Sequence, residues 1–144
     1  MLVLGETGRS GNFGLNGYER DTTPRLSARK DLVSARNAWS CGTSTAASVP
    51  CMFSHLGRDG FEARKANYES LIDVLHHAGL AVLWVDNQSG CKGLCDRVPN
   101  ANTRDLKQPG LCDSGDCLDE IMLGEMERQR EAPPCRTDNR GADP

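Results

Sequence analysis

The sequence lacks long apolar runs, blocks of positive charge and an export signal. Its longest apolar run extends only from Leu80 to Val85, whereas a membrane helix needs about 20 apolar residues. The first residues, Met1 to Glu6, contain no basic region, no apolar stretch of signal length and no cleavage site. The lysines and arginines are scattered and the net charge is −3, which excludes a nucleic-acid footprint and a polybasic membrane patch.

Two site patterns are also absent. The glycine-rich segment from Gly5 to Gly11 lacks the lysine of a phosphate-binding loop, so nucleotide binding through it is only an alternative hypothesis. The histidines, His55, His76 and His77, are not spaced to complete a zinc site with cysteine pairs.

Cysteine, in contrast, is abundant. The seven cysteines form three close pairs and one single residue: Cys41/Cys51, Cys91/Cys95, Cys112/Cys117 and Cys135. Close pairs favour disulfides in an oxidising compartment, with zinc binding as the rival interpretation because the two later pairs have spacings in or near the zinc range. Disulfides without an export signal would make sense if this chain is part of a longer protein.

Length and composition predict one soluble α/β domain. The chain has 144 residues, of which 38% are hydrophobic and 26% charged. In its first half we expect a buried strand over residues 1–4, a glycine-rich loop, a helix from Thr23–Pro24 to about Lys30, a strand over 32–39, a helix over 46–56 interrupted by Pro50, and a polar turn region over 57–65.

The second half contains the clearest helix pattern. Residues 67–78 place apolar side chains on one face, with Asn67 as the N-cap and Gly79 as the end. The run over 80–85 then predicts a strand buried on both sides, as in parallel sheets. Residues 86–116 show no period and contain two cysteine pairs, which predicts a stapled loop. A helix over 117–131 and a disordered tail over 132–144 complete the expectation.

The segment from Ser40 to Cys51 is the most informative one. It contains Thr43, Ser44 and Thr45 immediately before a helix start. A hydroxyl at that place can accept or contact a phosphoryl group, because the first N–H groups of a helix lack partners and the helix dipole is positive there. A Cys41–Cys51 bridge would hold such a nucleophile still. The other interpretation is an ordinary Ser/Thr N-cap in a stapled loop.

A set of motifs in a fixed order identifies a resemblance. They are Gly5-Glu6-Thr7, Asn16-Gly17-Tyr18, Thr22-Thr23-Pro24, Ser40-Cys41-Gly42-Thr43-Ser44-Thr45-Ala46, Ser48-Val49-Pro50-Cys51-Met52-Phe53-Ser54, Asp73-Val74-Leu75, Trp84, Asp86-Asn87, Lys92-Gly93 and Cys95-Asp96. Over about residues 1–127 the chain resembles the lipid A phosphoethanolamine transferases. These are membrane-anchored members of the alkaline phosphatase-like, or sulfatase-like, superfamily and include the mobile colistin-resistance enzymes.

The resemblance implies an activity and its residues. Phosphoethanolamine would pass from phosphatidylethanolamine to Thr45 and then to a lipid A phosphate, at the periplasmic face of the inner membrane. Glu6 and Thr45 would bind Zn²⁺, which lowers the pKa of the hydroxyl and neutralises phosphoryl charge. Thr43, Asn87, Gln88 and Lys92 would contact the substrate. The disulfides implied are Cys41–Cys51, Cys91–Cys95 and Cys112–Cys117. This places residues 1–131 in the N-terminal part of a periplasmic αβα sandwich with a mostly parallel sheet.

The chain also departs from the family pattern. Val85-Asp86-Asn87-Gln88 stands where family members usually read Arg-Asp-Asn-Asn, so a pocket amide is changed at Gln88. No match is found for the N-terminal membrane domain or for the later aspartate and histidine metal ligands. Because a catalytic zinc needs about three protein ligands and Glu6 with Thr45 supplies two, we expect an inactive fragment. A disulfide-stapled binding module without chemistry is the alternative.

Overall fold

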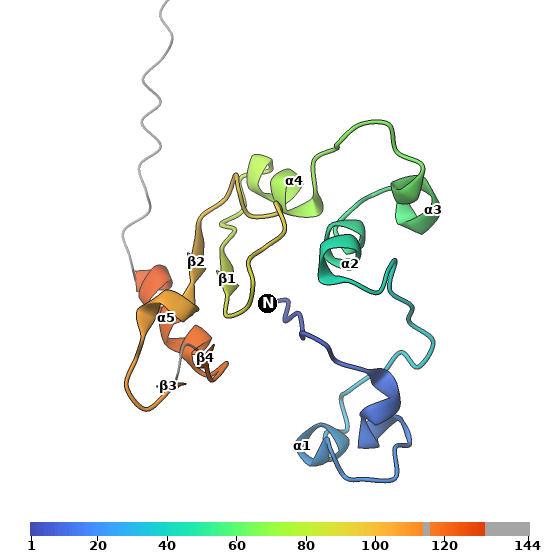
Figure 1. Ribbon diagram of the computed structural model, residues 1–144, viewed down its shortest axis with the longest axis vertical. Helices are drawn as coiled ribbons and strands as arrows, with labels where there is room; N and C mark the ends of the chain where they lie inside the picture. Colours follow the sequence, from blue (N-terminus) through green and yellow to red (C-terminus); the bar gives the residue numbers. More distant parts are fainter. Residues whose placement is uncertain (114–115, 132–144) are drawn as a thin grey trace, which may run out of the picture. The chain divides into compact units, whose positions relative to one another are not determined.

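Short helices and strands, joined by long loops, make up the part of the chain that the computed structural model describes, residues 1–113 and 116–131 (Figure 1). The chain forms two compact units, one from Met1 to Tyr68 and one that begins at Glu69. The prediction of one catalytic domain over residues 1–131 stays a prediction. The expected disordered tail over 132–144, with Cys135, lies outside the described residues.

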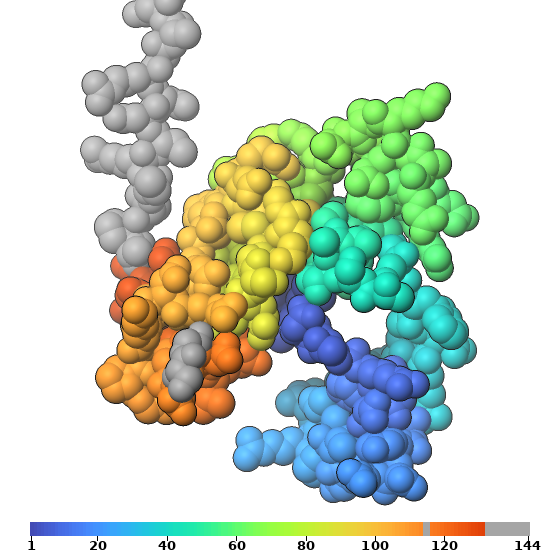
Figure 2. Space-filling view, viewed as in Figure 1, coloured from blue at the N-terminus to red at the C-terminus, as the bar shows by residue number. Residues whose placement is uncertain are grey.

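The first unit contains short helices. They are the 3₁₀ turns η1 (Ser10–Asn12) and η2 (Gly14–Asn16) and the helices α1 (Pro24–Ser27), α2 (Thr45–Met52) and α3 (Gly57–Glu62). In Figure 2 the blue atoms that include η1, η2 and α1 form one compact group. The hydroxyls of Thr22 and Thr23 accept hydrogen bonds from the N–H groups of Gly14 and Leu15 at 3.0 and 2.9 Å, so η2 is tied to the start of α1.

Two strands predicted for this unit are absent from its described residues. The segment Met1–Leu4 is exposed and unpaired, and Val33 and Trp39 in the segment 32–39 are almost fully exposed. An extended segment becomes a strand only where a neighbour receives its backbone hydrogen bonds, and the first unit offers no such neighbour. Segments 1–4 and 32–39 therefore have the apolar pattern of strands but no neighbouring strand in the first unit to pair with.

Helix boundaries in the first unit also differ from expectation. The helix after Pro24 ends at Ser27 rather than at Lys30, and α2 ends at Met52 rather than at residue 56. The region over 57–65, expected to be turns, contains α3, in which Arg58 pairs with Glu62 one helical turn later at 3.1 Å.

The second unit contains a small parallel sheet. It begins with α4 (Leu71–His77) and continues through β1 (Trp84–Asp86), β2 (Asn100–Asn102), the turn η3 (Thr103–Leu106), β3 (Cys112–Asp113), β4 (Asp116–Cys117) and α5 (Ile121–Glu131). Strands β1 and β2 are parallel, with Val85 opposite Ala101, whereas β3 and β4 form an antiparallel pair. The parallel arrangement expected for the run over 80–85 is confirmed, but only its last residues form β1 because β2 reaches no further.

The start of α4 is fixed by a different cap from the one predicted. Ser70, rather than Asn67, is the N-cap, and it exchanges hydrogen bonds with Asp73 in a capping box. Gly79 ends the helix in the left-handed region, with φ +83°, as predicted. Of the expected apolar face only Ile72 is buried, while Leu71 and Leu75 are exposed.

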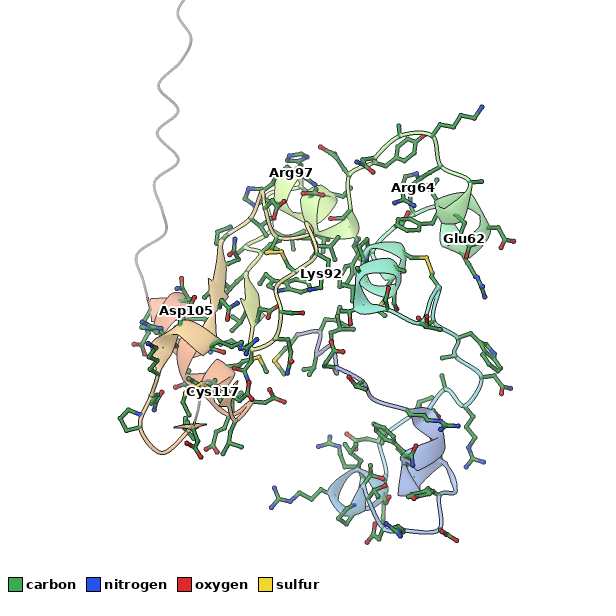
Figure 3. The ribbon with its side chains drawn as sticks, viewed as in Figure 1. Glu62, Arg64, Lys92, Arg97, Asp105 and Cys117 are labelled. Carbon is green, nitrogen blue, oxygen red and sulfur yellow. A yellow bond between two sulfur atoms is a disulfide. The ribbon has the colours of Figure 1, made fainter. Side chains whose placement is uncertain are left out.

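An ion pair connects α4 to the loop after β1. The Asp73 carboxylate accepts hydrogen bonds from Arg97 Nε at 2.8 Å and Nη2 at 2.6 Å (Figure 3). This guanidinium, assisted by Ser70, holds the pKa of Asp73 well below its usual range. The apolar core of the second unit lies around this region and in α5; it comprises Ile72, Cys91, Leu94, Cys95, Val98 and Ile121.

Candidate functional site

Helix α2 begins in the segment that the sequence singles out. Ser44 is its N-cap, and the Ser44 hydroxyl accepts the Ala47 N–H at 3.3 Å. Thr45 is the first helical residue and is half-buried. The cap and the candidate nucleophile are therefore different residues, so the two interpretations of the segment do not compete for one hydroxyl.

The Thr45 hydroxyl faces a carboxylate from the start of the chain. Thr45 Oγ1 donates to Glu6, with distances of 3.2 Å to Oε1 and 3.3 Å to Oε2. The Thr7 hydroxyl also donates to Glu6 Oε1, at 3.0 Å. The backbone of Thr7 has φ +54°, which is unusual for a β-branched residue and typical of strained functional loops. This turn brings three side-chain oxygen groups together across 39 positions of sequence.

The loop before α2 is closed by a disulfide. Cys41 and Cys51 are bonded, with their Cα atoms 6.3 Å apart. Just before this loop, the Ser40 hydroxyl donates to the Gly42 carbonyl at 2.6 Å and lies 2.7 Å from the Ser48 hydroxyl. A side chain at Gly42 would place its Cβ only 2.9 Å from the Ala47 Cβ. The glycine is thus required by the close approach of the loop to its own helix, and Thr43 lies exposed between them.

Glu6 and Thr45 offer oxygen ligands of the kind that a divalent metal accepts. The carboxylate and the hydroxyl share one small region, so both fit one side of a metal site. In the first unit His55 packs edge-on against Tyr68, and in the second unit His76 and His77 are exposed on α4.

The rival zinc interpretation of the cysteine pairs is excluded for the oxidised chain. Among the described residues, Cys91, Cys95 and Asp96 are a group of three His, Cys, Asp or Glu side chains close enough together to hold an ion, but the two cysteines form a disulfide. Cys112 and Cys117 are also bonded. The three disulfides that the resemblance implied are therefore all present in the structure, and their sulfurs are not thiolate ligands.

In the second unit, Asp86 organises the loop that follows β1. Its Oδ1 atom accepts the N–H groups of Gln88 at 2.6 Å and Gly90 at 3.3 Å, and its Oδ2 atom accepts Trp84 Nε1 at 3.3 Å. The loop therefore turns around one carboxylate, an arrangement typical of Asp after a strand. Gln88 is exposed on this loop.

Lys92 lies further along the same loop (Figure 3). Its ammonium group donates to the Ser89 carbonyl and hydroxyl, both at 2.7 Å. Its backbone is left-handed, with φ +54°, between Gly90 and Gly93, which also have positive φ. Ser89 is a polar contact of Lys92 that the sequence interpretation did not name.

Asn87 differs from the accessible residues on either side. It is 6% exposed, and Nδ2 donates both to the Cys117 carbonyl at 2.8 Å and to Asp119 Oδ1 at 2.9 Å. Its Oδ1 atom accepts the Thr103 hydroxyl at 2.8 Å. The sequence predicts a substrate contact for Asn87, whereas this amide uses both donor hydrogens inside the protein. Nothing in the local sequence indicated Thr103.

Comparison with known proteins assigns the fold. The sequence profile of the Sulfatase family matches residues 1–134. The chain belongs to the sulfatase family. The predicted sulfatase-like α/β fold is confirmed by the solved phosphoethanolamine transferase A of Neisseria meningitidis, an integral membrane protein, with a TM-score of 0.82 and 46% identity over 88% of this chain and 24% of that one. The separate soluble domain of the Neisseria enzyme gives a TM-score of 0.78 at 43% identity, over 88% and 39% of the two chains.

The curated proteins that this chain resembles include transferases named for phosphoethanolamine or phosphatidylethanolamine. The phosphoethanolamine transferase EptA of Salmonella typhimurium is 48% identical over 128 residues, which are 88% of this chain and 23% of that protein. The phosphatidylethanolamine transferase Mcr-1 of Escherichia coli is 42% identical over 130 residues, 85% of this chain and 24% of its own length. The chain thus spans about a quarter of these relatives. None of the helices in the described residues is long and apolar enough to cross a membrane.

Proposed function

We propose that this chain provides the nucleophile and part of the donor pocket of a lipid A phosphoethanolamine transferase. The observation that carries the proposal is the Thr45 hydroxyl, which begins α2 and donates to the Glu6 carboxylate. The similarity to transferases of this name supports it, and sulfatase membership disfavours a binding module without chemistry.

In the proposed reaction, Thr45 Oγ1 attacks the phosphorus of phosphatidylethanolamine. The new Oγ1–P bond forms as the bond from phosphorus to the diacylglycerol oxygen breaks, and that oxygen takes up the proton lost by the hydroxyl. A lipid A phosphate oxygen then attacks the same phosphorus, the Oγ1–P bond breaks, and Thr45 Oγ1 takes up the proton that the lipid A phosphate gives up. Glu6 orients the Thr45 hydroxyl through its hydrogen bond, and the first N–H groups of α2 can donate to phosphoryl oxygens.

Zn²⁺ would be held by Glu6 and Thr45, and when bound it lowers the pKa of the hydroxyl and offsets charge on the phosphoryl oxygens. Lys92 would exchange its bonds to Ser89 for the phosphate, which it binds as a point charge, and Gln88 and Thr43 would contact the same group. Because Glu6 and Thr45 supply two ligands, titration of the chain with zinc should show weak binding. Nanomolar affinity together with transfer activity would contradict the proposed inactivity of the isolated chain.

The proposed location is the periplasmic face of the inner membrane. Three disulfides require an oxidising compartment. A solved C-terminal periplasmic domain of EptC from Campylobacter jejuni matches 88% of this chain with a TM-score of 0.67 and 33% identity. Addition of a positively charged ethanolamine group to lipid A would weaken its attraction for cationic polymyxins, so polymyxin resistance is the phenotype expected of the complete enzyme.

A chimera tests the activity. The 128 matched residues of this chain would replace their counterpart in the Salmonella typhimurium relative, and mass spectrometry of lipid A would detect added phosphoethanolamine. Thr45→Ala should abolish the modification, whereas Ser44→Ala, which removes the cap but leaves the nucleophile, should retain it. Full modification by the Thr45→Ala chimera would refute the assignment.

A further inference from the structure

The buried Asn87 amide occupies a four-residue hydrogen-bond node in the second unit. Its partners are the Cys117 carbonyl, the Asp119 carboxylate and the Thr103 hydroxyl, at 2.8–2.9 Å. Thr103 is 0% exposed. Because buried polar groups are expensive to leave unpaired, a node of this kind fixes its members relative to one another.

The node is attached directly to the loop that carries the proposed donor-binding residues. Thr103 Oγ1 also lies 3.2 Å from the backbone carbonyl of Asp86, and the Asp86 side chain accepts the N–H groups of Gln88 and Gly90. Hydrogen bonds therefore connect Thr103 to Asp86 and Asn87, and Asp86 in turn to Gln88. Figure 3 labels Cys117, at one end of this arrangement, and Lys92, on the loop at the other.

Only an amide satisfies all of the partners at position 87. The carbonyl of Cys117 and the carboxylate of Asp119 both need a donor, while the Thr103 hydroxyl needs an acceptor. An aspartate would face the Asp119 carboxylate and lose both donors, and a leucine would remove the partner that the Cys117 carbonyl, the Asp119 carboxylate and the buried Thr103 hydroxyl share. The side chain is thus specified by its surroundings inside the protein.

We infer that Asn87 is a positioning residue for phosphoethanolamine binding: through Thr103, Cys117 and Asp119 it fixes the start of the loop that presents Gln88 and Lys92. The inference rests on the proposed function of that loop. It differs from a direct contact, because the Asn87 amide acts on the substrate only through the geometry of its neighbours.

Hydrogen exchange of the complete, oxidised chain tests the positioning role. Thr103→Val should accelerate exchange of the Gln88 and Gly90 amides about tenfold, the factor that corresponds to about 1.4 kcal/mol. The Ala78 amide, which bonds to Val74 in α4, should change much less, and Thr103→Ser should restore slow exchange. Unchanged loop amides, or an equal increase at Ala78, would overturn the inference.

A second set of variants covers the case in which Thr103→Val does not fold. Asn87→Asp should loosen the loop, and Asn87→Asp combined with Asp119→Asn should tighten it again, since the new amide can donate to the new carboxylate. A double variant no better than Asn87→Asp would overturn the inference.

Titration with soluble phosphoethanolamine then separates the two proposals. The Gln88 amide resonance should shift in the wild-type chain, and Thr103→Val should weaken this binding several-fold, with rescue by Thr103→Ser. Absence of wild-type binding would count against the proposed function, while the exchange data would still decide the positioning role. If Thr103→Val and Thr103→Ser bound phosphoethanolamine equally well, the proposed effect of the positioning residues on substrate binding would be overturned.

Discussion

Replacement of Asp73 by asparagine should destabilise the second unit. The Asp73 carboxylate is 1% exposed and accepts hydrogen bonds from the Arg97 guanidinium and from the N–H and hydroxyl groups of Ser70. An asparagine keeps one acceptor for Ser70 but loses the ion pair. Breaking a buried pair costs about 3–5 kcal/mol; since the Arg97 side chain is 55% exposed and solvent screens it, we expect about 2–3 kcal/mol for Asp73→Asn.

Urea denaturation of the oxidised chain measures this loss. The two tryptophans are Trp39, almost fully exposed in the first unit, and Trp84 in β1 of the second. A Trp39→Phe background therefore makes fluorescence specific for the second unit. With a denaturant dependence of about 1–3 kcal/mol per M, the midpoint should fall by about 0.7–3 M. Glu127→Gln, which changes an exposed carboxylate on α5, is the matched control.

The same variant should show a defined pH dependence. Because Arg97 lowers the pKa of Asp73 in the folded chain, its stabilisation is fully present above the ordinary carboxyl pKa of about 3.9. It is lost as the pH falls from there toward the lowered folded value. The difference in free energy of unfolding between wild type and Asp73→Asn should therefore become smaller below about pH 4. The reasoning would be refuted if Asp73→Asn lowered the free energy of unfolding at neutral pH no more than Glu127→Gln does. It would also be refuted if the difference in free energy between wild type and Asp73→Asn stayed constant on acidification.

Three further predictions concern the first unit. Gly42→Ala should cost about 1–3 kcal/mol in urea denaturation because its Cβ meets that of Ala47; unchanged stability would contradict the close approach. Ser44→Ala should lower stability by about 0.5–1 kcal/mol through loss of the cap. Thr45→Ala should lower stability less but abolish lipid A modification in the chimera. A larger loss of stability in Thr45→Ala, or loss of modification in Ser44→Ala, would contradict the separation of the two roles. Glu6→Gln should weaken zinc binding in calorimetry, and unchanged affinity would exclude Glu6 as a ligand.

Local patterns predicted the structure of the segment from Ser40 to Cys51 well: a helix start capped by a hydroxyl residue, in a loop closed by a disulfide. The hydroxyls before α2, the glycine at 42 and the cysteines at 41 and 51 act within one short stretch, so their spacing contains most of the information. The end of α4 at Gly79 is local in the same way, since a left-handed residue is needed there. The capping box of Ser70 and Asp73 also had a readable signal, a serine three residues before an aspartate.

Features that depend on distant partners were not predictable in this way. The segment Met1–Leu4 has the composition of a buried strand, but composition does not supply the neighbour that a strand needs. The contact between Asn87 and Thr103 joins residues 16 positions apart with no shared period. A substrate contact of Asn87 stays a prediction from its motif, which contained no signal for the partner Thr103.

The disulfides connect cysteines only 10, 4 and 5 positions apart along the chain. Short loops close with the smallest loss of chain entropy, so each of these thiols meets its native partner more often than any other. Oxidative maturation of this segment should then depend on a catalyst that inserts disulfides and very little on one that rearranges them. A strain without disulfide isomerase should still produce correctly paired chain.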